Sequence, residues 1–227
     1  MRTSITLLDW QRIQRRPCAG LMLRLALVVN DIATTDFIIF GSEPKEYGVD
    51  VWNGFQFYGM RMRLGHMREA MTIVEELANA RDLRLYIRRL SEDDKNHWRT
   101  VNRMRPGRRD YATFQKYIRL VRNKAAFHYD AQATQSALDR LAAGDVTGTC
   151  TILNTHSTQI RRSRFVAADS IVVVNICGEQ WGIDPSTTGD PGKAINAACE
   201  WTGKRGNALY QFGRDLCNEY FSDCRSL

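Results

Sequence analysis

Residues 117–130 read YIRLVRNKAAFHYD, and this stretch decides the fold that the sequence predicts. Apolar side chains recur around it at helical spacing, which predicts an amphipathic helix from about Asp110 to His128. The residues expected on its buried face are Phe114, Tyr117, Ile118, Val121 and Ala125. Residues 163–177 fit either a strand or a helix, but no second convincing strand is apparent in the sequence to pair with them, so the pattern as a whole favours an all-α fold.

The polar centre of this helix carries a candidate for RNA chemistry. Arg122 stays charged and can donate two hydrogen bonds to a phosphate, while His128 can exchange a proton near neutral pH. Asn123 could orient either the histidine or the phosphate. A proton shuttle beside a charge clamp is what RNA cleavage without a metal needs, so these three residues are the predicted catalytic set.

The same residues resemble the signature of the HEPN superfamily. That signature is an arginine, a polar residue and then a histidine after four to six residues; here five residues separate Arg122 from His128. The resemblance covers about residues 110–130. It implies an all-helical, HEPN-like bundle and a metal-independent endoribonuclease acting as a toxin or anti-phage defence effector. It also implies a homodimer, and a cognate antitoxin or defence-system protein as a possible partner.

Each of these residues also has a structural alternative. Arg122 could form an ordinary surface ion pair, and His128 could stabilise a helix C-terminus. On an ideal helix, six residues rotate a side chain by about 240°, so Arg122 and His128 do not share a face. A composite site shared by two chains of a dimer would resolve this difficulty. The second hypothesis is therefore a non-catalytic helical module that binds nucleic acid or protein. A nucleotide-binding regulatory domain is a third.

Positive charge is concentrated just ahead of and within the motif. The chain has 32 Lys and Arg against 25 Asp and Glu, but residues 61–124 alone hold 17 basic and 8 acidic residues. Such a concentration favours a polyanion such as RNA, although a solvated helix face or a dock for an acidic protein would explain it too. Trp98 and Tyr111 flank the cluster and could stack on bases, but buried packing is their more common role. The predicted RNA contacts are Arg99, Arg103, Arg105, Arg108, Arg109, Arg119 and Lys124.

Other classes of chemistry lack their sequence signals. The four histidines and six cysteines show no metal-ligand spacing, so neither a metal nor another cofactor is expected. No phosphate-binding glycine loop or nucleophile elbow is present, which argues against kinase, dehydrogenase and esterase functions. Polar residues interrupt the apolar stretch from Leu21 to Phe40. This stretch is therefore predicted to be a core helix of a cytoplasmic protein rather than a membrane span.

The remaining helices follow from apolar periodicity and from capping residues. Predicted helices cover residues 21–40, 55–80, 91–104, 131–143 and 163–177, with a further C-terminal helix from Pro191. Ser91 with Asp94 predicts a capping box, and Pro106-Gly107 predicts a break. Loops are predicted over residues 41–54 and 144–160. The chain is thus predicted to form one helical domain over 1–227, with a motif-bearing core of about 18–143 and a C-terminal extension of about 160–224.

Overall fold

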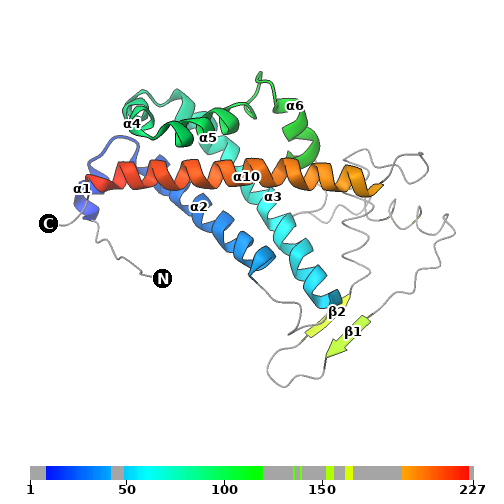
Figure 1. Ribbon diagram of the computed structural model, residues 1–227. Coiled ribbons are helices and arrows are strands. Elements are labelled where there is room, and N and C mark those ends of the chain that lie inside the picture. The colour runs from blue at the N-terminus through cyan, green and yellow to red at the C-terminus, as the bar shows by residue number, and fades with distance from the viewer. Residues whose placement is uncertain are drawn as a thin grey trace. The chain divides into compact units, whose positions relative to one another are not determined.

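A computed structural model describes residues 9–41, 49–119, 135, 139, 152–155, 162–165 and 191–224 (Figure 1). Almost all described elements are helices, which confirms the predicted predominance of α structure. The chain divides into two compact units that interleave along the sequence. Unit 1 comprises residues 1–33, 66–112 and 203–227, and unit 2 comprises residues 34–65 and 113–202. Each unit is described by itself below.

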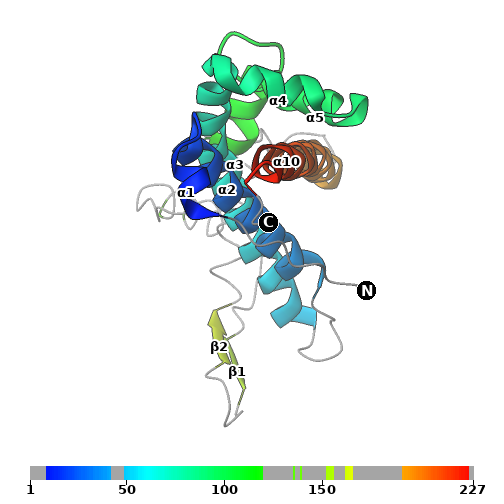
Figure 2. The ribbon, with the colours of Figure 1, turned by 90° about the vertical axis from the view of Figure 1, so that its left-hand side faces the viewer.

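Unit 1 is built from short helices packed with parts of three long ones. It contains α1 (Trp10–Gln14), η2 (Arg81–Leu83), α4 (Arg84–Arg89) and α5 (Glu92–Asn102). It also contains segments of α2 (Ala19–Phe40), α3 (Val49–Asn79) and α10 (Pro191–Ser222). Figure 2 looks along α10 and shows α4 and α5 on the same side of it. The core side chains of this unit that are at most 1% exposed include Met22, Leu25, Ile32, Met67, Met71, Leu77, Leu83, Met104, Phe212, Leu216 and Tyr220.

The helices of unit 1 approach closely where small residues permit it. A Cβ atom on Gly213 of α10 would lie 2.6 Å from Cγ2 of Val29 on α2, so only glycine fits this crossing. The two ends of the described chain are also fastened together. Arg16 contacts Asp223 at 2.8 Å, and the Tyr220 hydroxyl donates to the Pro17 carbonyl at 2.8 Å. The short helices therefore rest on a packed and hydrogen-bonded base.

Local signals placed several helix boundaries correctly. Ser91 Oγ accepts a hydrogen bond from the Asp94 backbone N–H and donates one to the Asp94 carboxylate, so the predicted capping box opens α5. Pro191 is the first residue of α10, where the missing N–H of proline carries no penalty. The predicted stop at Gly41 is also confirmed, since α2 ends at Phe40.

Three predictions about local structure were wrong. The chain becomes helical at Val49, so α3 includes residues 49–54 that were predicted to be a loop. The strands β1 (Ile152–Thr155) and β2 (Arg162–Phe165) pair antiparallel, with Ile152 opposite Phe165. The prediction placed β1 in a loop and the start of a helix within β2, because no second strand was apparent. The reason is that RSRF, the sequence of β2, lacks the apolar alternation that identifies a strand.

Unit 2 contains the beginning of the predicted motif helix. Here α6 (Tyr111–Phe114) continues into η3 (Gln115–Arg119), which is a π-helical turn rather than the expected regular α-helix. Phe114 and Ile118 are buried, as predicted. Residues 120–134 lie outside the described residues, as does the predicted helix over 131–143 apart from two positions.

Unit 2 also holds a half-buried ion pair between two long helices. Arg63 Nη1 of α3 lies 3.3 Å from Asp36 Oδ1 of α2. Burial raises the pKa of Asp36 and lowers that of Arg63, and their mutual attraction only partly opposes these shifts. In the same unit, the Tyr117 ring of η3 meets Trp201 of α10 edge to face, with 5.6 Å between centroids.

Candidate anion-binding groove

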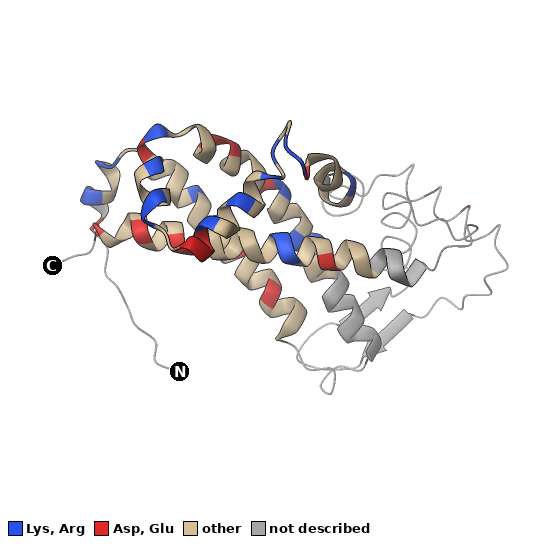
Figure 3. Cartoon of the chain, turned by 45° about the horizontal axis from the view of Figure 1, so that its top comes forward, with Lys and Arg blue, Asp and Glu red and all other residues tan. Residues whose placement is uncertain are grey.

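Four arginines of unit 1 line one surface groove of about 330 Å³. We call this feature the arginine groove. Its residues come from the end of α3, from α4, from α5 and from the turn that follows α5. They are Leu77, Ala78, Arg84, Ile87, Arg88, Trp98, Asn102, Arg105 and Arg108. Figure 3 shows basic residues gathered along α4, α5 and the turn after α5.

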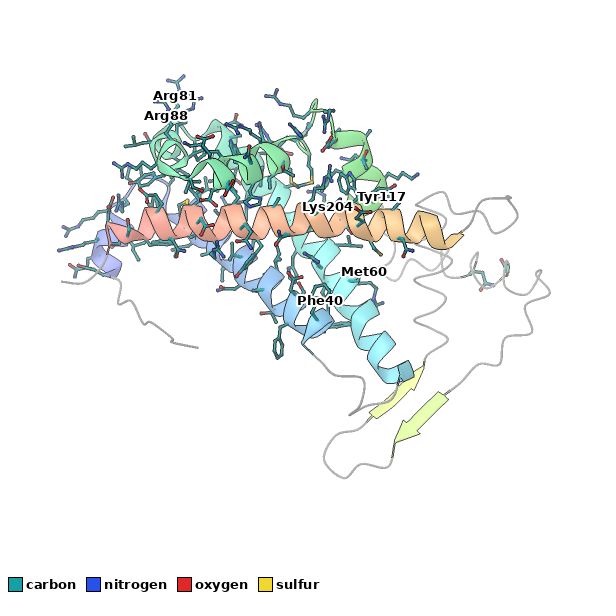
Figure 4. The ribbon with its side chains drawn as sticks, viewed as in Figure 1. Phe40, Met60, Arg81, Arg88, Tyr117 and Lys204 are labelled. Carbon is teal, nitrogen blue, oxygen red and sulfur yellow. The ribbon has the colours of Figure 1, made fainter. Side chains whose placement is uncertain are left out.

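Helix α4 supplies two of the four guanidinium groups. Arg84 and Arg88 are four residues apart, so they lie on one face of α4, and both are exposed. In Figure 4, Arg88 projects outward, away from α10. The buried Leu83 and Leu90 bracket this short helix and fix it to the core. Position and spacing therefore hold two cations side by side at the groove rim.

A tight turn supplies the other two arginines. The Arg108 backbone N–H donates to the Arg105 carbonyl at 3.0 Å, which closes a four-residue turn around Pro106-Gly107. Gly107 has φ 72°, and proline at the second position with such a glycine at the third is the signature of a type II turn. The turn brings Arg105 and Arg108 close together because they are its first and last residues. Thus the predicted helix break is also what builds this side of the groove.

The wall of the groove on α5 is fixed by packing against α10. Trp98 stacks on the buried Phe212, with 4.8 Å between ring centroids and 28° between ring planes. Asn102 lies one turn further along α5, and its side-chain oxygen accepts a hydrogen bond from Arg105 Nη1 at 2.9 Å. The indole was predicted either to stack on bases or to pack internally. It packs on Phe212 and also lines the groove.

Among the described residues that line the arginine groove, none carries a carboxylate. Within the described part of the chain, the side chains of Arg84, Arg88 and Arg108 have neither a hydrogen-bond nor an ion-pair partner. Neighbouring acids are engaged elsewhere: Glu76 with Arg24, and Glu92 with Lys95 and Arg99. Like charges held together without counter-ions repel each other, so an anion in this groove would be stabilised.

The structure separates the seven predicted RNA contacts into groups. Arg105 and Arg108 lie in the arginine groove, whereas Arg103 is exposed outside it. Arg99 pairs with Glu92 at 3.4 Å. Arg109 pairs with Asp110 at 3.0 Å. Of Arg119 only the backbone is described, and Lys124 lies outside the described residues.

The pairing of Arg109 belongs to a structural network. The Asp110 carboxylate, 7% exposed, accepts hydrogen bonds from Arg205 at 3.0 Å and from Arg109 at 3.0 Å. Burial acts to raise the pKa of Asp110, but the two arginines outweigh it and hold this pKa below its usual range. Arg109 therefore already has a carboxylate partner, which Arg108 lacks among the described residues.

The predicted catalytic residues Arg122, Asn123 and His128 lie outside the described residues, so their geometry remains a prediction. The two other histidines that the structure describes have surroundings suited to a structural role. His66 Nδ1 lies 3.4 Å from Asp31 Oδ2. His97 lies half-buried on α5.

Sequence reasoning missed Arg84, Arg88 and Asn102. The predicted RNA contacts come mainly from the densest run of arginines, residues 99–109, which follows α4 in the sequence. A signal was available, because RLYIRR at 84–89 places two arginines at helical spacing with no acid between them. The sequence does not reveal that α4 and the turn at residues 105–108, about twenty residues later, line the same groove.

Other chemistries find little support in the described residues. Burial raises the pKa of the Cys217 thiol to about 12, so it stays protonated at neutral pH. Burial also raises the pKa of Cys199 and of Cys18. Among the residues that the structure describes, no three His, Cys, Asp or Glu side chains gather as metal ligands would. None of the described helices is both long enough and apolar enough to span a membrane.

The chain matches no known protein family, and neither the curated proteins nor the solved structures include a match. Function must therefore be argued from the groove and from the sequence motif.

Proposed function

We propose that this protein binds RNA through the arginine groove. The observation that carries the proposal is the set of four arginines around one hollow, with no carboxylate among the lining residues that the structure describes. Guanidinium groups donate paired hydrogen bonds that match phosphate oxygens, and RNA presents a regular series of phosphates. Further exposed arginines outside the groove, Arg81 and Arg103, extend the basic surface beyond what a single small anion would need.

We propose further that bound RNA is cleaved by the HEPN-like motif. In this mechanism His128 takes the proton from a ribose 2′-OH or protonates the leaving 5′-oxygen, and Arg122 stabilises the charge on the scissile phosphate. Asn123 orients one of these groups. Attack by the 2′-oxygen on phosphorus breaks the bond to the 5′-oxygen and leaves a 2′,3′-cyclic phosphate. Support for this step is the sequence motif, Arg122-Asn123 followed by His128.

The resemblance also supports a biological role and an assembly. The proposed role is that of a toxin or anti-phage defence effector held in check by a cognate antitoxin or another defence-system protein. The proposed assembly is a homodimer in which one chain supplies Arg122 and the other His128. Mixing Arg122→Ala with His128→Ala protein should then restore part of the cleavage, whereas no restoration would show that each chain carries a complete site.

One experiment separates binding from cleavage. Purified protein is incubated with labelled RNA in EDTA, and both bound RNA and cleavage products are measured. We expect cleavage without a divalent metal, and we expect His128→Ala to abolish it while RNA binding persists. The matched control is His97→Gln, a histidine of α5 that lines neither the arginine groove nor the motif.

Each alternative gives a different result in this experiment. Cleavage that depends entirely on added Mg²⁺ contradicts the proposed chemistry. RNA binding without any cleavage, unchanged by His128→Ala, identifies the protein as a non-catalytic binding module, which is the second candidate function. That candidate is favoured by the groove itself, because a groove lined by Arg84, Arg88, Arg105 and Arg108 needs no histidine to bind phosphate. Absence of any RNA binding contradicts the proposed function and leaves, of the second candidate, only a module that binds DNA or protein.

A further inference from the structure

Below its charged rim, the arginine groove has an apolar floor. Leu77 is 1% exposed, Ala78 and Ile87 are half-buried, and Trp98 is held in place by its stacking on Phe212. Contacts to phosphates alone need hydrogen-bond donors and positive charge, which the apolar floor does not supply. The floor therefore points to a ligand with an apolar portion close to its charges.

Hydrogen-bond donors predominate among the polar side chains that line the groove, because four of them are arginines. Arg105 Nη1 occupies the side-chain oxygen of Asn102, so the amide N–H₂ group is what Asn102 has left to offer. Arg105 Nε is shielded from solvent and has no hydrogen-bond partner among the described residues. Guanidinium, amide and indole N–H groups together favour a ligand rich in acceptors. Phosphate oxygens and the acceptors of a nucleobase fit this requirement.

The volume of the groove limits how much of a polynucleotide can enter. About 330 Å³ lies at the low end of ligand sites, which span roughly 300–1,000 Å³. A duplex keeps its bases stacked inside and offers phosphates on a convex surface, so its bases cannot reach the floor. In a single strand, a base can leave the stack and lie against an aromatic or aliphatic wall.

We propose that the arginine groove takes one unstacked nucleotide of a single RNA strand. Its flanking phosphates lie on Arg84, Arg88, Arg105 and Arg108, and its base or ribose lies against Ala78, Ile87 and Trp98. This inference rests on the proposed RNA binding and adds a preference for single strands. It also gives the groove a positioning role that is separate from the residues that would cleave the chain.

The test fills the floor without changing charge. Ala78→Leu adds apolar volume to the lining, whereas Asn79→Leu places the same leucine side chain at the exposed next residue of α3, outside the lining. Affinities are measured for one RNA sequence as a single strand and as a duplex, at fixed salt. We expect the unaltered protein to prefer the single strand by about tenfold, the effect of one well-placed base. We expect Ala78→Leu to remove most of that preference, and Asn79→Leu to preserve it.

A second variant guards against misfolding. Ile87→Gln replaces a half-buried side chain of α4 by a polar one of similar size, and thermal unfolding shows whether each variant is folded. Loss of single-strand affinity in both folded floor variants, with duplex affinity unchanged, is the expected result. If neither folded variant alters the preference for single strands, the floor does not hold a nucleotide.

The failure of this inference is distinct from failure of the proposed function. If single strand and duplex bind equally while Arg88→Gln weakens both, RNA binding stands and the unstacked nucleotide is wrong. If neither RNA binds, the proposed function fails. Two further ligands complete the test. A free nucleoside monophosphate that binds as tightly as the strand would make the groove a small-molecule site. Polyglutamate that binds as tightly as RNA would indicate an acidic protein partner. Either result overturns the inference.

Discussion

Two grooves of unit 1 have the same volume, about 330 Å³ each, and opposite electrostatic character. In the second, which we call the mixed-charge groove, three carboxylates accompany a single arginine. Arg89 lies 3.5 Å from Glu219, and Ser91 donates to Asp94. The lining of the mixed-charge groove is Arg89, Leu90, Ser91, Asp94, Asp215, Asn218, Glu219 and Ser222.

The comparison shows that volume alone does not identify a binding site. In the mixed-charge groove the charged side chains already have partners, since Arg89 pairs with Glu219, Asp94 accepts from Ser91 and Asp215 pairs with Arg214, so a ligand entering it would have to break existing contacts. The arginine groove has three guanidinium groups without partners among the described residues, so a ligand would add contacts at little cost. Adjacent residues of α4 belong to the two grooves, since Arg88 lines the first and Arg89 the second.

The largest expected effect comes from removing three cations of the arginine groove at once. Replacing Arg84, Arg88 and Arg108 by glutamine should weaken RNA binding about a hundredfold, since each phosphate contact contributes on the order of 1 kcal/mol. Thermal stability should not fall, because mutually repelling charges are being removed. Fluorescence anisotropy with labelled RNA and a thermal melt measure the two properties. A variant that binds RNA normally would show that this groove is only a solvated surface.

Smaller and more selective effects are expected at the two neighbouring arginines of α4. Arg88→Gln should weaken RNA binding about fivefold, whereas Arg89→Gln should change it less than about twofold, because Arg89 faces the other groove. For the free energy of unfolding, Arg89→Gln should have the larger effect of the two, since it loses a partly exposed pair with Glu219 worth about 0.5 kcal/mol. The same binding and unfolding measurements apply. Equal losses of RNA affinity would mean that general charge, not the arginine groove, attracts the RNA.

The sequence predicts local features such as helix starts, but it does not predict which distant segments of the chain come together. Ser91 begins α5 through a contact with Asp94 three positions away, and Pro191 begins α10 at a position where its missing N–H carries no penalty, so the sequence predicts both starts well. The pairing of Ile152 with Phe165 joins strands whose sequences carry no alternation, and it was missed. The arginine groove was half predicted. Arg105 and Arg108 stood out in a dense run, while Arg84 becomes relevant only because α4 and the turn line one hollow.

The smallest expected effect is the dependence of stability on pH. It arises from carboxylates that pair with arginines inside the fold and not from the arginine groove. Hydrogen bonds from Arg214 hold the pKa of Asp215 below its ordinary value, and Arg205 and Arg109 do the same for Asp110 against the effect of burial. A depressed folded-state pKa stabilises the fold fully above the unfolded value near 3.8, and this contribution is lost as pH falls through the lower folded value. The contribution of these two carboxylates to the free energy of unfolding should therefore be constant from neutral pH to about pH 5 and should fall in stronger acid.

RNA affinity should not change with pH between about pH 5.5 and 8, because the charged side chains of the arginine groove are arginines and arginine stays charged throughout this range. Cleavage should change over the same interval, since His128 is proposed to exchange protons. Affinity and cleavage rate measured on the same samples give both curves. A parallel decline of the two would point to titration within the binding site, which the arginine groove does not predict.

The most direct test of RNA binding by the arginine groove is the salt dependence of RNA affinity. Each phosphate contact lowers the slope of log affinity against log salt concentration by about 0.7 for single strands, so four arginines predict a slope near −3. Replacing Arg84 and Arg88 by glutamine should make the slope shallower by about 1.4. The matched control, with Arg89 and Arg214 replaced by glutamine, removes the same charge from residues paired with Glu219 and Asp215. Its slope should match that of the unaltered protein. A slope that is unchanged in the first variant, or equally shallow in both, would contradict the claim that the arginine groove holds the RNA phosphates.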